Sequence, residues 1–313
     1  MRFGAGKLSG IVRLPRNRGL GIGGISIRVV APVSATLRIA SPLYRPFLQD
    51  RAATTPGERM SVRLLGDGWP SLQHAERIFD TRDSWVLFRD PSGYWLCLAR
   101  PGSEEPLWVA RFKPGGRRVD LYCRFGLPDA RGRMAIDLPL AYPLDQLLLM
   151  HYFARRKGML THAAGWIHKG KAYLFAGVSG AGKSTISELL VKSRTGKVLS
   201  DERMIVRKIG KEMIAFGTPW AGTAGIARNG GAPLGGIFFL KHGRESRCEE
   251  MDAVAAADRM LPMISIPWYE PDTAAAIIAF SRRVCSTVPC HEFRFTPDSA
   301  AIDFIRDFIR KRI

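Results

Sequence analysis

The sequence predicts an α/β (α+β) fold in which a β-rich N-terminal domain precedes a domain of alternating strands and helices. Residues from about 36 to 140 show short apolar runs separated by turn signals, which is typical of strands. After Gly158, apolar runs of strand length alternate with segments of helical periodicity. The composition changes near residue 140, so we expect domains at 36–140 and 141–313. A chain of 313 residues is long enough for both.

The first 35 residues are predicted to form a basic, poorly ordered leader. Seven Lys and Arg residues and no acid fall in the first forty positions, and the whole chain has a net charge of +19. Such a charge attracts polyanions. The segment lacks the interleaved aromatic residues and the recognition helix of nucleic-acid-binding arms, so nucleic acid is not expected as a partner.

The β-rich part contains one clear hairpin and further strands. Residues 85–88 and 94–98 are apolar runs on either side of a turn that begins with Asp90 and Pro91 and ends at Gly93. Further strands are predicted at 107–112 and 118–124. A helix then opens at Pro143 and ends before Gly158, because proline favours the first helical position and glycine follows the last.

The second part begins with another hairpin. Lys169 and Gly170 form a two-residue turn of the kind that joins antiparallel strands, here 166–168 and 171–176. A helix at 184–193, a short strand at 198–200 and a buried strand at 236–240 follow. Helices are predicted at 253–261, at 272–284 and from residue 298 onward.

A glycine-rich loop between the strand at 171–176 and the helix at 184–193 carries the strongest motif. Its sequence matches G-x-x-x-x-G-K-[ST], in which backbone N–H groups and the helix N-terminus surround phosphate oxygens. The lysine neutralises the β- and γ-phosphates, and the following hydroxyl binds Mg²⁺. The motif therefore predicts an ATP site made of Gly177, Val178, Ser179, Gly180, Ala181, Gly182, Lys183, Ser184 and Thr185.

An acid is expected close to such a loop. Asp201 follows the short apolar strand at 198–200, and its distance from Lys183 in the sequence suits one helix and a return to the sheet. We therefore expect Ser184 and Asp201 to hold Mg²⁺, and Asp201 to accept a proton from the phosphate acceptor. Glu202 is a second candidate, whose alternative is a solvated surface carboxylate.

His162 is placed by register. If Lys169 and Gly170 are the hairpin turn, His168 pairs with Lys171 and, further along, His162 lies opposite Gly177 at the start of the loop. A histidine there could relay protons at the triphosphate. The alternative is a histidine that only caps the end of a strand.

These residues together resemble the catalytic domain of the HPr kinase/phosphorylase family, and more closely the HPr-kinase-related kinases. The resemblance covers about residues 140–310 and implies a P-loop core similar to that of ATP-dependent phosphoenolpyruvate carboxykinase. It also implies that His162, Asp201 and Glu202 serve proton transfer and Mg²⁺ binding. Glu202 stands where HPr kinase proper has aspartate, and the glycine-rich docking segment of that enzyme is not recognisable. The resemblance therefore does not imply HPr itself as the acceptor.

The motif predicts an ATP- and Mg²⁺-dependent kinase, and the resemblance implies that it phosphorylates a serine hydroxyl of a peptide or protein. The basic surface suggests that this acceptor is acidic. Two alternatives stay open: a P-loop kinase of a small metabolite, and an ATP-gated module that binds a partner without transfer. Five scattered cysteines are too few for a disulfide scaffold. With no apolar run of membrane-spanning length, we expect a cytoplasmic protein without a membrane anchor. Assembly into a homo-oligomer is compatible with the sequence.

Overall fold

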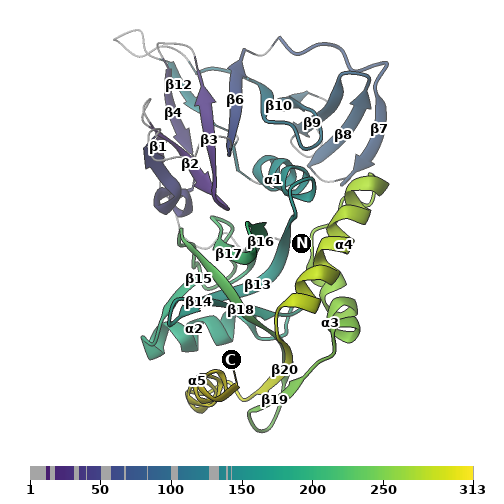
Figure 1. The fold of residues 1–313 in the computed structure, drawn as a ribbon. Helices are drawn as coiled ribbons and strands as arrows, with labels where there is room; N and C mark the ends of the chain where they lie inside the picture. The colour runs from purple at the N-terminus through teal and green to yellow at the C-terminus, as the bar shows by residue number, and fades with distance from the viewer. Residues whose placement is uncertain are drawn as a thin grey trace. The chain divides into compact units, whose positions relative to one another are not determined.

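The computed structural model describes residues 12–14, 18–31, 35–39, 41–50, 58–66, 68–82, 84–99, 105–126, 134–138, 140–141 and 143–312. The chain is a mixed α/β protein and divides into two compact units (Figure 1). The N-terminal unit consists mainly of Ile25–Tyr152, and the C-terminal unit of Phe153–Ile313 together with Ile22–Gly24. The division therefore falls later than the boundary expected near residue 140.

The N-terminal unit is built from strands. A nine-stranded sheet has the order β5-β2-β3-β6-β11-β10-β9-β8-β7, and β1, β4 and β12 form a second sheet. A 3-10 helix covers Pro42–Phe47, and the helix α1 spans Leu144–Ala154. The strands are β1 (Val12–Leu14), β2 (Arg18–Ile22), β3 (Ile25–Val30), β4 (Ala35–Ile39), β5 (Leu48–Asp50), β6 (Arg59–Leu65), β7 (Glu76–Asp80), β8 (Trp85–Asp90), β9 (Gly93–Ala99), β10 (Pro106–Phe112), β11 (Arg118–Cys123) and β12 (Met134–Asp137).

The structure corrects the prediction of a poorly ordered leader for the part of it that is described. β2 and β3 lie within the predicted leader, and Ile25, Ile27 and Val29 are buried while Arg28 between them is exposed. This alternation is the two-residue period of a strand with one covered face. The arginines give this segment a basic composition, but the apolar residues between them form the buried face of β3. Residues 1–11, 15–17 and 32–34 of the leader lie outside the described residues.

Other predicted elements of the N-terminal unit are confirmed. β8 and β9 form the expected hairpin, with Asp90 opposite Gly93. The side chain of Asp90 accepts hydrogen bonds from the backbone N–H groups of Ser92 and Gly93, which fixes the turn. α1 lies where the proline and glycine signals predict a helix, and its His151 is buried between the rings of Tyr94 and Phe112.

The C-terminal unit alternates strands and helices. Its sheet has the order β14-β13-β16-β17-β18-β20-β19, with β15 paired to β13 and β14 paired to β18. The elements are β13 (Gly158–His168), β14 (Lys171–Ala176), α2 (Lys183–Ser193), β15 (Lys197–Ser200), β16 (Arg203–Ile209), β17 (Glu212–Gly217), β18 (Gly231–His242), β19 (Arg247–Glu250), α3 (Ala253–Met260), a 3-10 turn (Leu261–Met263), α4 (Pro271–Thr287), β20 (Cys290–Phe295) and α5 (Ala300–Arg312).

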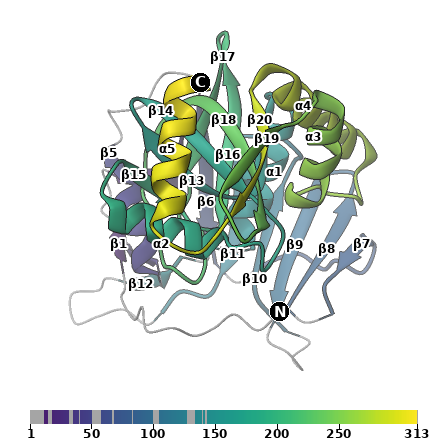
Figure 2. The ribbon, with the colours of Figure 1, turned by 90° about the horizontal axis from the view of Figure 1, so that it is seen from below.

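α2 and α5 cover the same face of this sheet. Ile186 and Leu190 of α2 share one buried cluster with Ile305 and Ile309 of α5 and with aromatic residues of the strands. Figure 2 shows α5 lying across the strands next to α2, with α3 and α4 gathered to one side. This packing fixes the start of α2, and with it the glycine-rich loop, against the sheet. No helix among the described residues is long and apolar enough to cross a bilayer.

Candidate active site

The glycine-rich loop joins the end of β14 at Ala176 to the start of α2 at Lys183. Gly180 and Gly182 have φ angles of 83° and 96°, in the left-handed region that other residues enter only at a cost. A Cβ atom on Gly182 would also lie 2.8 Å from Cζ of Phe295. The first N–H groups of a helix have no partner within it, so this loop directs unpaired donors and the positive end of α2 towards one point.

Lys183 is held at the base of the loop. Its side chain is only 7% exposed, and Nζ donates to the carbonyl oxygens of Gly177 (2.9 Å) and Val178 (3.2 Å). Burial lowers the pKa of Lys183 below its ordinary value, and the carboxylate of Glu202 opposes that shift. A buried ammonium group is costly unless an anion compensates it. The loop therefore holds a cation whose charge an added anion would stabilise.

The other loop residues differ in exposure. Val178, Ser179 and Gly180 are exposed and Gly177 is buried, while Ala181, Gly182, Ser184 and Thr185 are half-buried. The Ser184 hydroxyl forms a 2.8 Å hydrogen bond with the hydroxyl of Thr223. The loop therefore presents an accessible rim above the buried Lys183.

Asp201 lies at the break between β15 and β16 and is fully buried. Its carboxylate accepts hydrogen bonds from the backbone N–H groups of Gly222 (2.9 Å), Ala224 (2.7 Å) and Ile226 (3.2 Å). Both oxygens are thus engaged in holding the segment 222–226. In this arrangement Asp201 is an anchor for that segment, which differs from the free metal ligand and proton acceptor expected from the sequence.

Glu202, the next residue, faces His162 instead. Nδ1 of His162 lies 3.1 Å from Oε1 of Glu202, and because a carboxylate only accepts, the imidazole donates. This hydrogen bond is the main cause that lowers the pKa of Glu202; burial acts against it, and Lys183 adds to the lowering. Both side chains are about one-third exposed. An ionised acid and a histidine are therefore coupled near the buried Lys183.

The register predicted for the hairpin is confirmed along β13 and β14, from His168 opposite Lys171 to Ala163 opposite Ala176. β14 ends at Ala176, so the predicted pair between His162 and Gly177 is not part of the ladder. On its other side, β13 pairs with β16, and His162 lies opposite Arg203. This pairing, rather than the hairpin, directs the imidazole to Glu202.

Three residues that the sequence did not single out shape this site. The hydroxyl of Ser200 accepts hydrogen bonds from the N–H groups of Glu202 (3.3 Å) and Arg203 (3.2 Å), which forms the turn that carries both acids. His242, the last residue of β18, donates from Nε2 to the carbonyl oxygen of Gly180 (2.8 Å). The hydroxyl of Thr223 forms a hydrogen bond with the hydroxyl of Ser184. Only Ser200 has a local signal, a serine two residues before an acid.

A phosphate-binding loop of this kind is expected to bind magnesium together with the triphosphate. No group of three or more His, Cys, Asp or Glu side chains that could hold a metal occurs among the described residues. Mg²⁺ usually takes one or two protein oxygens and completes its shell with phosphates and water. The hydroxyl of Ser184 and the carboxylate of Glu202 are donors of this kind, so the residues fit a magnesium ion that arrives with a triphosphate.

Comparisons with known proteins give little further guidance. No family model and no curated protein matches the sequence. Among solved structures, the chain is similar to an Hpr(Ser) kinase/phosphatase from Coxiella burnetii, with 12% sequence identity and a TM-score of 0.30. That match covers 49% of this chain and 97% of the other. A similarity of this size does not establish a shared activity, so the function is argued from the residues of the site.

Proposed function

We propose that the C-terminal unit binds ATP with Mg²⁺ and transfers the γ-phosphate to a serine hydroxyl of a peptide or protein. The observation that carries this is the buried ammonium group of Lys183 at a glycine-rich helix start, beside the ionised Glu202. The triphosphate would supply the anion that Lys183 lacks and would accept hydrogen bonds from the N–H groups of the loop. The ATP-binding residues are those of the motif, from Gly177 to Thr185.

In the proposed reaction the acceptor oxygen attacks the γ-phosphorus as the bond from that phosphorus to the β,γ-bridging oxygen breaks, and ADP leaves. His162 takes the proton of the acceptor hydroxyl at Nε2 while Nδ1–H donates to Glu202. In this arrangement the carboxylate orients the imidazole and stabilises its charged form, as in catalytic triads. Lys183 and the loop neutralise charge on the phosphates, and positioning supplies most of the rate enhancement.

Ser184 and the second carboxylate oxygen of Glu202 are the protein ligands that we assign to Mg²⁺, which would help to neutralise the transferring phosphate. Asp201 is fully buried and already accepts three backbone hydrogen bonds, so we assign the carboxylate ligand of the ion to its neighbour Glu202. Asp201 is proposed instead to hold the segment 222–226, so that Thr223 stays beside Ser184.

The test is incubation of the purified protein with γ-labelled ATP and a cell extract, followed by separation of proteins from small molecules. Label in a protein band, recovered as phosphoserine after hydrolysis, supports the proposal. Label in a small molecule would favour a metabolite kinase, and the absence of transfer would favour an ATP-gated binding module. The Lys183→Ala variant controls for kinases in the extract, because it should add no label above the extract alone.

A further inference from the structure

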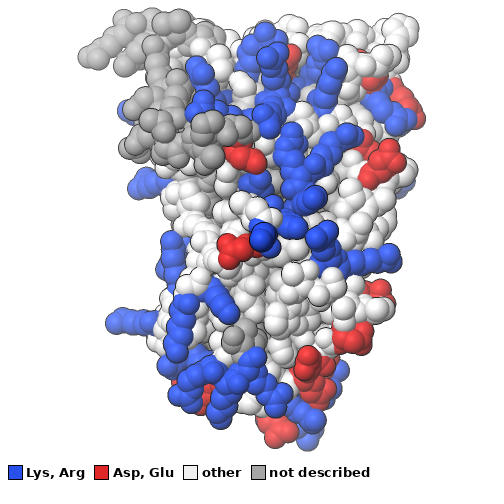
Figure 3. All heavy atoms as spheres, viewed as in Figure 1, with Lys and Arg blue, Asp and Glu red and all other residues white. Residues whose placement is uncertain are grey.

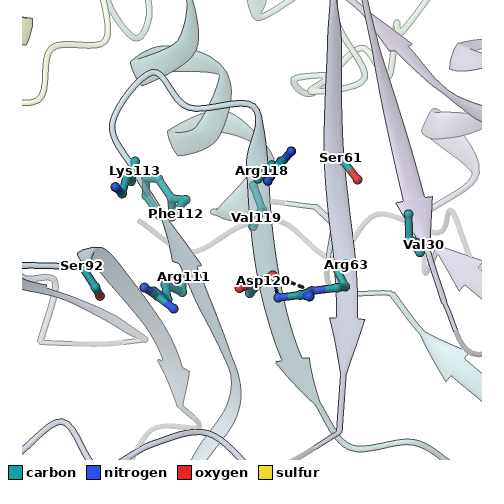
Figure 4. A pocket seen from close by; sticks show the side chains of 10 residues that line it. All are labelled: Val30, Ser61, Arg63, Ser92, Arg111, Phe112, Lys113, Arg118, Val119 and Asp120. Carbon is teal, nitrogen blue, oxygen red and sulfur yellow. Dashed lines mark hydrogen bonds and ion pairs between the residues drawn. The ribbon is translucent and has the colours of Figure 1, made fainter.

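The nine-stranded sheet of the N-terminal unit carries a hollow of about 590 Å³. Its lining comes from neighbouring strands and turns, and Figure 4 shows the side chains gathered around it. Four basic side chains and one acidic side chain line the hollow: Arg63, Arg111, Lys113, Arg118 and Asp120. None of these residues belongs to the candidate active site in the C-terminal unit.

The register of the strands places these charges in two rows across the sheet. In the first row, Asp120 of β11 lies between Arg63 of β6 and Arg111 of β10, each directly opposite it. In the second row, Ser61 of β6 lies between Arg28 of β3 and Arg118 of β11. The two rows are two residues apart along each strand, so all these side chains project from the same face about 6.6 Å apart along the strands.

Lys113 completes the second row. It follows Phe112, which pairs with Val119, so its position continues the register opposite Arg118. Arg111 lies in β10, and Lys113 follows the end of that strand two residues later. If the extended backbone continues to Lys113, both side chains project from one face. Two cations therefore follow one another along the strand direction, in addition to those set side by side across the sheet.

The positive charge of the hollow is largely uncompensated. Asp120 forms an ion pair with Arg63, with Nη2 of the arginine 2.8 Å from Oδ1. Arg111 lies over the ring of Trp95, with Cζ 5.3 Å from its centroid. Lys113 and Arg118 have no ion pair within the part of the chain that the structure describes. Four cations against one carboxylate leave a surplus of three positive charges around one small cavity.

We infer that this basic hollow binds an acidic segment of a peptide in an extended conformation, through side-chain carboxylates two residues apart. Alternate side chains of an extended chain lie on one side at a spacing of about 6.6 to 7 Å, which matches the spacing between the two rows, as between Arg118 and the pair of Arg63 and Asp120. Arginine binds carboxylates through two parallel hydrogen bonds. The hydroxyl of Ser61 between Arg28 and Arg118 adds a neutral donor.

The same hollow is poorly suited to nucleic acid. Single strands bind on exposed aromatic rings that stack with bases, whereas Trp95 is 4% exposed and lies beneath Arg111. The carboxylate of Asp120 in the centre of the first row would also repel a phosphodiester backbone. Figure 3 shows that Lys and Arg side chains, in blue, outnumber Asp and Glu side chains, in red, over the face in view.

The inference rests on the proposed function only for the identification of the bound peptide as the phosphate acceptor. Binding itself requires no nucleotide, so it can be measured separately from phosphoryl transfer. A failure of transfer with intact peptide binding would overturn the proposed function alone. Phosphoryl transfer by a wild-type protein that does not bind the acidic peptide at the hollow would overturn this inference alone.

The experiment measures the fluorescence anisotropy of a short labelled peptide, with glutamate at alternate positions, on titration with the full-chain protein in low salt. Lys113→Glu combined with Arg118→Glu should raise the dissociation constant by about tenfold or more, because two attractions become repulsions. The matched control combines Lys192→Glu with Lys211→Glu, two exposed lysines of the C-terminal unit. It changes the net charge equally and should alter the dissociation constant by less than about twofold.

Two further arms make the result decisive. The double variant Lys113→Gln and Arg118→Gln removes two positive charges without adding negative ones, so it should weaken peptide binding less than the charge-reversed variant does. It also provides the test if the charge-reversed protein does not fold. A peptide with glutamine in place of glutamate should not bind, and Lys183→Ala should bind the acidic peptide as the wild type does. Equal weakening by the control pair, or an oligothymidylate that binds more tightly than the peptide at the same ionic strength, would overturn the inference.

Discussion

Nδ1 of His162 lies 3.1 Å from Oε1 of Glu202. The two residues come from different strands, His162 from β13 and Glu202 from the turn that leads into β16. Lys183 on α2 contributes to the lowered pKa of Glu202, so the three groups form one electrostatic unit.

Glu202→Gln should lower the stability of the protein only when the carboxylate is ionised. The pKa of Glu202 is lowered in the folded protein from its ordinary value of 4.5. A lowered pKa means that the stabilisation is present above pH 4.5 and is lost as the pH falls through the folded pKa. Urea unfolding should show the variant about 1 kcal/mol less stable near pH 7. The difference should vanish under strongly acidic conditions, and an equal difference at all pH values would mean that the ionised carboxylate of Glu202 is not its source.

His162→Ala should lower kcat by roughly 10²-fold and leave KM for ATP nearly unchanged. The imidazole is proposed to take the acceptor proton, whereas the triphosphate is held by the loop and Lys183. Steady-state kinetics with the acceptor identified by labelling would measure both constants. His168→Gln is the control, because His168 lies on the same strand and hydrogen-bonds to the carbonyl oxygen of Thr195. A fully active His162→Ala protein would leave His162 without a catalytic part.

The sequence predicted the elements around the loop because their signals are local. The motif and the turn at Lys169 and Gly170 are each visible in a few residues. The partners of the acids could not be predicted in this way. Asp201 accepts hydrogen bonds from the N–H groups of Gly222, Ala224 and Ile226. His162 donates one to Glu202. In both cases the partners are distant in the sequence. Which of two adjacent acids is accessible depends on these contacts.

The prediction of a poorly ordered leader was wrong for a related reason. Arginines at every few positions dominated the composition of the first 35 residues, while the alternation at Ile25, Ile27 and Val29 spans only one short strand. β3 is stabilised by its parallel pairing with β6, which begins at Arg59. β3 also pairs with β2 across the turn at Gly23 and Gly24, whose φ angles are 61° and 77°. This two-glycine turn is a local signal of a hairpin, but the arginine-rich composition outweighed it in the prediction.

Asp201→Asn should destabilise the protein more than Glu202→Gln does. The carboxylate of Asp201 accepts three backbone hydrogen bonds, and an amide would direct N–H groups at one or more of these donors. Leaving such buried donors unpaired costs about 1 to 3 kcal/mol, which denaturant unfolding at neutral pH would detect. Limited proteolysis should show earlier cleavage within 222–226. If the variant is as stable as the wild type and has lost only phosphoryl transfer, Asp201 acts as a metal ligand or as the base instead.

Gly182→Ala should be more harmful than Gly180→Ala, although both residues have positive φ. A Cβ atom on Gly182 meets the ring of Phe295, whereas nothing lies within 4 Å of one on Gly180. Backbone strain should cost both variants about 1 kcal/mol or more, and Gly182→Ala should show a further loss in thermal unfolding. Gly210→Ala, with a φ of 59° in the turn between β16 and β17 and open space around it, controls for strain away from the loop. Equal melting temperatures for all three variants would contradict the proposed contact with Phe295.

The most direct test of the account is the binding of ATP with Mg²⁺ to the wild type and to Lys183→Ala, measured by titration calorimetry and by thermal unfolding. At a hundredfold excess of ATP over its dissociation constant, the wild type should gain about 2.7 kcal/mol of stability. Lys183→Ala should lose most of this gain, because the buried ammonium group that the triphosphate compensates is gone. Lys192→Ala, an exposed lysine on the same helix, should keep it. Wild-type affinity in Lys183→Ala, or no binding of ATP to the wild type at all, would contradict a nucleotide site at this loop.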